Sequence, residues 1–467
     1  MAERFEAHMN DADALMWNIE KDPQLRSTIV AVMVLDRPPD WPALQDRIEQ
    51  ATRAIPRMRQ RVVTPMLRLG PPHWSGAPDF DLRYHVRRLQ APSPGDFATV
   101  LDLATTAAMS PFDRARPLWE YTSVEGLADG SSAIILKVHH SMTDGVGGLE
   151  LLMGLFDLER DPPAGASEPA ARTAPDDLDA STPFGLVAPS LDHRRRRAMG
   201  IAQRGVGEGL HAAQRLVRDP VHAASDAARA GRSVVEYLAP ATSPRSPIMR
   251  GRTLGRDLAT LEVPLDRLKA AGRSVGASMN DAFVAGVVGG LSRYHEFHGA
   301  SVDDLRMMMP INLRVDDDTL GGNHFTPARF LVPADVKDPA ERISVLSERC
   351  RWIRNEPAVN LTDALATVFN ALPVAFTTQF LGAMFKCADF VASNMAGAPV
   401  PVYLAGARLE RVFAFGPLSG AAVNLTLISH CGTCCIGVNS DSVAVPDPEI
   451  LVEHVDAAFA EIVALAP

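Results

Sequence analysis

The strongest constraint on the fold is an apolar strand that ends in two histidines and runs into a glycine-rich turn. Residues 133–138 are mostly apolar and β-branched, which predicts a buried strand. His139 and His140 end this strand, and glycines from Gly145 onward predict a turn that leads into a helix over residues 149–158. Neighbouring residues of a strand point to opposite faces of its sheet, so only one of the two histidines faces a given cavity.

The same stretch combines a candidate base with a means of holding it. Asp144 lies within the turn, where a carboxylate can fix the orientation of a ring or of the backbone. A neutral imidazole is the usual general base near pH 7. The alternative is that both histidines are structural residues whose hydrogen bonds are made within the protein. For an isolated histidine this structural interpretation would be favoured. The carboxylate, the glycines and the strand together favour a functional site.

Other catalytic patterns are missing from the sequence. It has no G-x-S-x-G nucleophile elbow, no phosphate-binding P-loop and no metal-ligand cluster. The remaining histidines singled out are scattered and are expected to be surface or capping residues: His73, His85, His295, His298 and His324. These features favour direct attack by a substrate hydroxyl or amine over a covalent enzyme intermediate, and they predict that neither a metal nor a cofactor is needed.

Composition restricts the remaining possibilities. A chain of 467 residues suits two domains of about 200 residues each. A formal net charge of −10 argues against nucleic acid as a partner, and the polar opening argues against secretion. Five cysteines, three of them within residues 431–435, predict buried reduced thiols in a cytoplasmic protein and not a zinc site.

The order of patterns along the chain predicts two domains and a linker. Residues 1–160 and 254–467 each mix strand-like and helix-like patterns, and residues 161–253 predict a linker with a basic helical segment around Arg194–Arg197. That segment fits either an anionic membrane surface or a solvated linker. Residues 369–385 are apolar but short for a membrane span, and they predict a buried or interfacial helix.

Several elements are expected with defined bounds. Strands are expected over residues 26–35, 306–311, 405–417 and 422–430. Helices are expected over residues 41–55, 97–109, 279–294 and 448–465. Arg314 follows one of these strands, and it is either a buried partner of Asp144 or an exposed arginine beside an acidic loop.

These residues together resemble a known family, the bacterial wax ester synthase/acyl-CoA:diacylglycerol acyltransferases. This family is related to chloramphenicol acetyltransferase and to the condensation domains of peptide synthetases. The likeness covers nearly the whole chain and rests, besides the histidine motif, on Phe80–Val86, Pro111–Asp113, Pro117–Glu120, Asn280–Asp281, Pro310–Arg314, Gly322–Asn323 with Phe325, Ser393–Gly397 and Tyr403–Ala407.

The resemblance implies a fold and a role for each site residue. The fold would be α/β with mixed sheets, as two chloramphenicol-acetyltransferase-like domains in a V with an active-site channel between them. His140 would be the base, supported by His139. Asp144 would pair with Arg314 and so hold the turn that begins at Gly145. The candidate residues for the substrate channel are Asn280, Asp281, Ser393 and Asn394.

The resemblance also implies a reaction and its partners. The protein would move a long-chain acyl group from acyl-CoA to diacylglycerol or a long-chain alcohol, working at a membrane or lipid-droplet surface. Two alternatives remain open from the sequence. One is acylation of a non-lipid hydroxyl or amine, and the other is an inactive relative that only binds lipid droplets.

Overall fold

The structure is a computed structural model with side chains. Apart from residues 188, 192 and 195, it describes residues 7–66, 70–142, 154–162, 182–186, 243–312, 325–354 and 362–467. Asp144, Gly145, Arg314 and nearly all of the predicted basic segment lie outside the described residues, so the roles predicted for them stay predictions.

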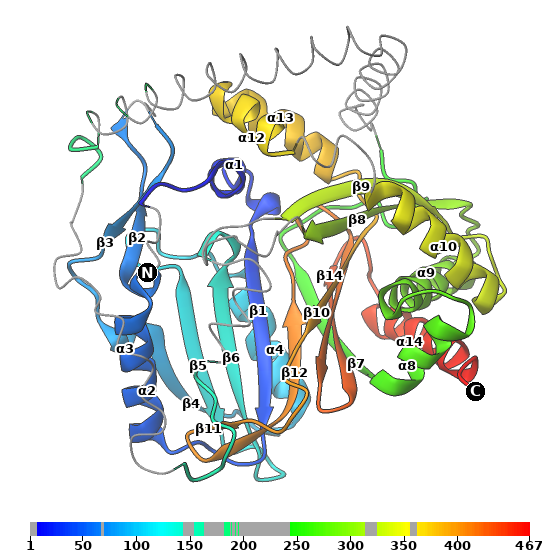
Figure 1. Cartoon of the computed structure of the whole chain (residues 1–467), viewed down its shortest axis with the longest axis horizontal. Coiled ribbons are helices and arrows are strands. Elements are labelled where there is room, and N and C mark those ends of the chain that lie inside the picture. The colour runs from blue at the N-terminus through cyan, green and yellow to red at the C-terminus, as the bar shows by residue number, and fades with distance from the viewer. Residues whose placement is uncertain are drawn as a thin grey trace, which may run out of the picture.

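The first large sheet has six strands in the order β11-β12-β1-β6-β5-β4 (Figure 1). Its neighbours pair antiparallel, except for the parallel pair β4 and β5. A small second sheet pairs β2 with β3. The strands of these two sheets are β1 (Thr28–Leu35), β2 (Gln60–Val63), β3 (His73–Gly76), β4 (Val86–Gln90), β5 (Trp119–Glu125), β6 (Ser132–His139), β11 (Tyr403–Leu404) and β12 (Ala407–Phe415).

The other large sheet also has six strands, in the order β7-β14-β13-β10-β8-β9. Strand β10 pairs parallel with both of its neighbours, and the remaining pairs are antiparallel. Both large sheets are therefore mixed. The strands are β7 (Arg256–Pro264), β8 (Asp304–Asn312), β9 (Phe325–Pro333), β10 (Phe390–Ala396), β13 (Val423–His430) and β14 (Thr433–Asp441).

Helices cover the faces of both sheets (Figure 1). In the first half, α2 packs on one face of the sheet and α4 packs on the other, each through its own apolar cluster. In the second half, α8, α9, α10 and α14 share one large core with the sheet. The helices are α1 (Asp11–Ile19), α2 (Trp41–Ala54), α3 (Leu82–His85), α4 (Phe97–Met109), α8 (Leu265–Ser274), α9 (Met279–Phe297), α10 (Pro339–Arg354), α12 (Thr362–Ala371), α13 (Val374–Phe385) and α14 (Pro448–Ala464), with short 3-10 turns η1 (Pro23–Leu25), η2 (Pro56–Arg59) and η4 (His140–Met142).

The two large sheets meet where β12 approaches β14. Strand β12 belongs to the later part of the chain but pairs with β1 and so completes the first sheet. A Cβ atom at Gly437 would lie 2.2 Å from the carbonyl oxygen of Ala414, so only glycine allows this close approach of backbones. The domain bounds predicted from the sequence remain predictions, and this crossing ties residues 407–415 to the first sheet.

Several expected elements are confirmed closely. Helix α4 has the expected bounds, and α2, α14, β1 and β13 differ from expectation by one or two residues at their ends. The helix expected over residues 369–385 is instead two helices, because Pro373 has no N–H to donate and ends one helix before α13 begins. None of the described helices is long and apolar enough to span a membrane.

Three further expectations are wrong. The helix expected to reach residue 158 is not formed at residues 154–158, where Asp157 instead bridges to Tyr403. Cys431 is exposed in the turn between β13 and β14, although the other four cysteines are buried as expected. His85 and His295 were expected to be surface or capping residues, and both are fully buried. His295 does lie in the last turn of α9, where its Nδ1 is 2.7 Å from the Leu291 carbonyl oxygen. His85 lies between the stacked rings of Phe80 and Trp119.

Candidate active site

His139 is the last residue of β6, and its ring is held on both sides. Its Nε2 lies 2.8 Å from Glu20 Oε1, and its Nδ1 lies 2.7 Å from the Ser141 hydroxyl oxygen. The backbone amide of Ser141 also donates to Nδ1, over 3.1 Å. Only 2 % of the His139 side chain is exposed, so the ring is fixed in the interior.

These contacts determine where the proton of the neutral His139 ring lies. A backbone N–H can only donate, so the Ser141 amide requires a lone pair on Nδ1. The proton therefore lies on Nε2, where it donates to Glu20. Taking a second proton on Nδ1 would break the bond from the Ser141 amide.

Glu20 is a buried carboxylate that joins three segments of the first half. Its Oε1 accepts from the Ser27 amide over 2.6 Å, and its Oε2 lies 3.0 Å from the Arg114 guanidinium. Burial alone would raise the pKa of the Glu20 carboxyl. The hydrogen bonds from His139 and the Ser27 amide, together with the nearby Arg114 guanidinium, outweigh burial and hold this pKa below its ordinary value. The carboxylate is therefore charged at neutral pH.

His140 follows directly and begins η4. It is half-buried, in contrast to its neighbour. Its backbone N–H donates to the Ser27 carbonyl oxygen over 2.8 Å. Because Ser27 binds Glu20 through its amide and His140 through its carbonyl, the position of His140 depends on the same buried carboxylate.

Lys137, on the same strand as His139, is a second buried charged residue. Lys137 is 2 % exposed, and its Nζ lies 3.5 Å from Glu120 Oε1. Burial lowers the pKa of Lys137, while Glu120 opposes that shift. The Lys137 ammonium also lies 4.4 Å from the centre of the Phe112 ring, and that ring meets His139 edge-on. The motif residues Phe112 and Glu120 thus help to pack the strand that carries the histidines.

The predicted channel residues of the second half come from two elements. Asn280, in the first turn of α9, and Asn394, in β10, are brought together: Asn394 Nδ2 donates to Asn280 Oδ1 over 3.4 Å. Ser393 precedes Asn394 and is half-buried. These residues belong with the second sheet, whereas His140 follows a strand of the first.

Asp281 is used to begin α9. Its carboxylate accepts from the Ser278 amide and hydroxyl over 2.9 and 2.7 Å, and from the Ser347 hydroxyl over 3.0 Å. Ser278 in turn accepts from the Asp281 amide, which completes a capping box. Asp281 is only 5 % exposed. It therefore has a structural role, and contact with a substrate stays a prediction.

Nothing in the sequence pattern pointed to Glu20, Ser27 or Arg114 as partners of the histidine pair. Glu20 lies 119 positions before His139, in an ordinary polar run between α1 and β1. No spacing rule links such distant residues. Among the described residues, no group of three or more His, Cys, Asp or Glu side chains is arranged to hold a metal ion.

Two family models match the chain. The wax ester synthase/diacylglycerol acyltransferase catalytic domain matches residues 9–283, and the WS/DGAT C-terminal domain matches residues 321–463. The chain belongs to the wax ester synthase/diacylglycerol acyltransferase family. The predicted family is thereby confirmed, and so is the prediction that the protein is an acyltransferase.

Relatives of this acyltransferase support the assignment over full length. A Mycobacterium tuberculosis protein named "Putative diacyglycerol O-acyltransferase" is 38 % identical over 463 residues, covering 99 % of this chain and 93 % of the relative. A second M. tuberculosis protein of the same description is 28 % identical over 477 residues, covering 98 % and 97 %.

Solved structures confirm the fold class of the acyltransferase. The wax ester synthase/diacylglycerol acyltransferase from Marinobacter aquaeolei VT8 matches with a TM-score of 0.65 at 20 % identity, covering 98 % of both chains. The first condensation domain of the calcium-dependent antibiotic synthetase matches with a TM-score of 0.61 at 15 % identity, covering 100 % of this chain and 98 % of that domain. The predicted mixed α/β fold of the acetyltransferase and condensation-domain type is therefore confirmed.

Proposed function

We propose that this acyltransferase moves a long-chain acyl group from acyl-CoA to a hydroxyl of diacylglycerol or of a long-chain alcohol, with His140 as general base. The observation that carries the proposal is the division between the two neighbouring histidines. Both ring nitrogens of His139 are engaged in the interior, whereas His140 is the more exposed of the two. A base has to reach the proton that it removes, and His140 meets that requirement better.

The chemistry follows from the base and the thioester. His140 takes the hydroxyl proton as the acceptor oxygen attacks the thioester carbonyl carbon. The carbon–sulfur bond then breaks, and His140 returns the proton to the departing thiolate, giving an ester and free CoA. General-base help of this kind is worth about 10²–10⁴ in rate, and holding both substrates together lowers the barrier further. The thioester is already activated, so no metal or further cofactor takes part.

The surrounding residues have positioning roles in this proposal. Glu20 and Ser27 fix His139 and the backbone of His140. Asp144 and Arg314 hold the turn after the histidines, and Asn280 and Asn394 line the channel between the two halves. Since both acceptors dissolve in lipid, the protein works peripherally at a membrane or droplet surface, with the basic segment around Arg194–Arg197 as its contact.

Release of CoA from palmitoyl-CoA, with diolein or hexadecanol as acceptor, tests the proposal. We expect release to require an acceptor and to fall at least 10³-fold in His140→Ala, which loses the base. His139→Ala should lose less activity, because it removes support and not the base. His454→Ala, on the outer helix α14, is the matched control and should keep the wild-type rate.

Two outcomes would contradict the proposal. His140→Ala with an unchanged melting temperature and near wild-type release would exclude this residue as the base. A folded wild-type protein that releases no CoA with either lipid, but does so with a water-soluble alcohol or amine, would replace the proposed acceptor.

A further inference from the structure

Helices α12 and α13 form a hairpin that lies against α1, outside both large sheets (Figure 1). Phe369 in α12 stacks on Phe380 in α13 with 5.7 Å between the ring centres, so the second helix folds back on the first. Pro373 lies at the bend and cannot continue the first helix. Residues 364–385, the α12–α13 hairpin, contain no charged side chain. The molecule therefore carries an uncharged element on its outside.

The polar side chains of the hairpin face α1. Asn370 donates through Nδ2 to the Asp11 carbonyl oxygen over 2.8 Å, and its Oδ1 accepts from Asn18 over 3.4 Å. The Thr367 hydroxyl donates to the Asp11 carboxylate. Asp11 and Asn18 both belong to α1. Among the described side chains of the hairpin, Gln379 is the only polar one that is exposed. The polar groups of the hairpin are thus used inside the protein.

The outward side of the hairpin is apolar. Val368, Leu372 and Phe376, here called the apolar stripe, are 57 %, 37 % and 53 % exposed. Besides Gln379, the other exposed residues of the described hairpin are three alanines and Pro373. A helix on the surface of a protein in water normally turns its polar side outwards. The hairpin does the reverse, which indicates that its outer side faces an apolar medium.

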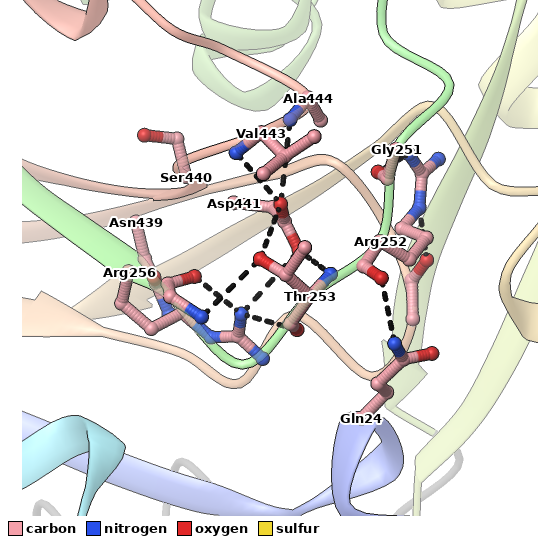
Figure 2. Close-up of polar contacts among 12 residues, drawn as sticks. Gln24, Gly251, Arg252, Thr253, Arg256, Asn439, Ser440, Asp441, Val443 and Ala444 are labelled. Atoms are coloured by element: carbon pink, nitrogen blue, oxygen red, sulfur yellow. Dashed lines mark hydrogen bonds and ion pairs between the residues drawn. The ribbon is translucent and has the colours of Figure 1, made fainter.

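The support beneath the hairpin is fixed to the rest of the molecule. Leu381, on the inner side of α13, packs in one apolar cluster with Leu25 of η1. Gln24, also in η1, donates through Nε2 to the Arg252 carbonyl oxygen over 2.6 Å (Figure 2). The Arg252 guanidinium donates to the Gly420 carbonyl oxygen over 2.6 Å, which holds this segment in turn. Contacts from distant parts of the chain therefore order the hairpin, and an ordered surface loses little conformational entropy when it docks.

Basic side chains lie at the base of the hairpin. Lys386 directly follows α13 and pairs with Asp22, so these two charges offset each other. Lys21, beside Asp22, is exposed and has no ion pair within the described part of the chain. One positive charge is therefore left over at this end of the hairpin. Long basic side chains of this kind can reach lipid phosphates while apolar neighbours lie deeper.

A lipid surface fits the stripe better than a protein partner does. A specific protein interface typically carries about one hydrogen bond per 100–200 Å² of its area. The outward side of the described hairpin offers one amide side chain, Gln379, for such bonds. Acyl chains of lipids need no hydrogen bonds. Helices α12 and α13 have 10 and 12 residues, whereas a membrane span needs about 20, so the hairpin can lie in a lipid surface without crossing it.

We propose that the apolar stripe docks the protein on a phospholipid surface, an inference that rests on the lipid acceptor of the proposed function. Val368, Leu372 and Phe376 enter the outer part of the acyl-chain layer, and Lys21 and Lys386 lie at the level of the phosphates. This contact depends on apolar burial, and so it differs in kind from a contact made by the basic segment with anionic lipid.

The position of the hairpin connects docking with the candidate active site. The hairpin rests on α1, and Trp17 of that helix meets the His139 ring edge-on with 5.6 Å between the ring centres. Glu20, which accepts from His139, directly follows the same helix. Docking through the stripe thus brings the lipid surface next to the helix that supports the histidine pair.

Co-sedimentation of the full-length protein with vesicles of pure phosphatidylcholine, without acyl-CoA, tests the proposal. The double variant Val368→Ser with Phe376→Ser should bind about tenfold more weakly than wild type or worse, because two apolar side chains no longer enter the acyl-chain layer. Phe297→Ser with Val443→Ser is the matched control. These residues are of the same types, are 57 % and 59 % exposed and lie outside the hairpin, so the control should bind like wild type.

Two further arms identify what the stripe meets. The fluorescence of Phe376→Trp, measured against wild type, should shift to the blue on vesicles and be quenched by nitroxide-labelled phosphatidylcholine, whereas that of Phe297→Trp should not change. Binding to phosphatidylcholine should persist at high salt and after Arg194–Arg197 are replaced by glutamine, because neither change alters apolar burial. Thermal unfolding of each variant shows that it is folded before the measurement.

The outcomes separate this proposal from the acyl-transfer reaction. Equal vesicle binding by the folded stripe variant and wild type would overturn the docking proposal, even if acyl transfer to diolein is found. A wild-type dimer that the stripe variant loses would also overturn it, since a second copy of the chain would then cover the stripe. Vesicle binding that depends on the stripe, in a protein that transfers no acyl group, would support docking and contradict the proposed function.

Discussion

Two regions of this acyltransferase each use a buried carboxylate to hold a candidate site residue, but they do so over different distances in sequence. Glu20 holds the end of β6 through Ser27, Arg114 and His139, which lie 7, 94 and 119 positions away. Asp281 holds the start of α9 mainly through Ser278, which is three positions away. One carboxylate therefore depends on the assembled first half, and the other forms its contacts together with its own helix.

This difference predicts different costs when each carboxylate is lost. Removing Glu20 leaves the His139 imidazole N–H and the Ser27 backbone amide without their acceptor in the interior, while the exposed Arg114 guanidinium can turn to water. Removing Asp281 leaves the Ser278 amide and hydroxyl at the start of α9 without their acceptor. Water, together with the Ser347 hydroxyl, can partly replace it.

Glu20→Ala should have the largest effect. We expect the free energy of unfolding to fall by about 1–3 kcal/mol for each of the two donors, His139 Nε2–H and the Ser27 amide, that is left in the interior without its acceptor. Acyl transfer should fall as well, because Ser27 and His139 no longer fix the position of His140. Chemical denaturation and CoA release measure the two effects, and a loss below that of Asp281→Ala would reverse the comparison.

The stability of Glu20→Gln, measured as a function of pH beside wild type, is the control for the charge of Glu20. The pKa of Glu20 is lowered in the folded state, so its charge stabilises the protein above the ordinary glutamate pKa of about 4.3. That stability is lost as the pH falls through the lowered folded pKa. The stability difference between wild type and Glu20→Gln should therefore stay constant from pH 7 to about pH 5 and shrink below about pH 4. A difference that grows in acid would contradict the assigned direction.

Asp281→Ala should have an intermediate effect, a loss of about 1–2 kcal/mol, which is the usual range for a helix cap. Asp281→Asn keeps an acceptor and should lose less. Ser278→Ala removes the reciprocal half of the capping box and is the matched comparison. If Asp281→Ala also raises the KM for the acceptor in a protein of normal stability, the residue has a substrate role besides the cap.

The pair formed by Asn280 and Asn394 should have the smallest effect on stability. Their hydrogen bond is long, at 3.4 Å, so a double-mutant cycle with alanine should give a coupling energy below about 0.5 kcal/mol. If the two amides line the channel, each single variant should still change kinetics with either lipid acceptor. Strong coupling in stability without a kinetic effect would assign the pair to structure alone.

Much of the local structure could be predicted from residue patterns. Helix α4 begins at Phe97 after the cap Asp96, whose side chain accepts from Thr99, and it ends before Pro111, as the sequence indicates. Strands β6 and β13 follow from their apolar, β-branched runs. The break at Pro373 was visible in the sequence, but whether the proline would end the helix or merely bend it depends on the packing of α12 and α13.

Contacts between distant segments were not predicted, because no periodicity encodes them. His85 was expected to be a surface or capping residue, yet it is buried between Phe80 and Trp119 with Nδ1 bonded to the Trp119 carbonyl. Asn280 and Asn394 were each predicted to line the channel, but nothing in the sequence indicated that their side chains form a hydrogen bond with each other. Residues 369–385 were expected to be buried or interfacial, and only the contacts with α1 show which side of the hairpin is exposed.

The sequence by itself determined the family, the mixed α/β fold, the adjacent pair of histidines and the helix that begins near Asn280 and Asp281, because these depend on local pattern and spacing. Tertiary structure decided that His139 donates to Glu20, that β12 joins the first sheet, and that the polar side chains of α12 face α1. The physical reason is that buried charges and unpaired acceptors find their partners only when segments more than a hundred residues apart are packed together.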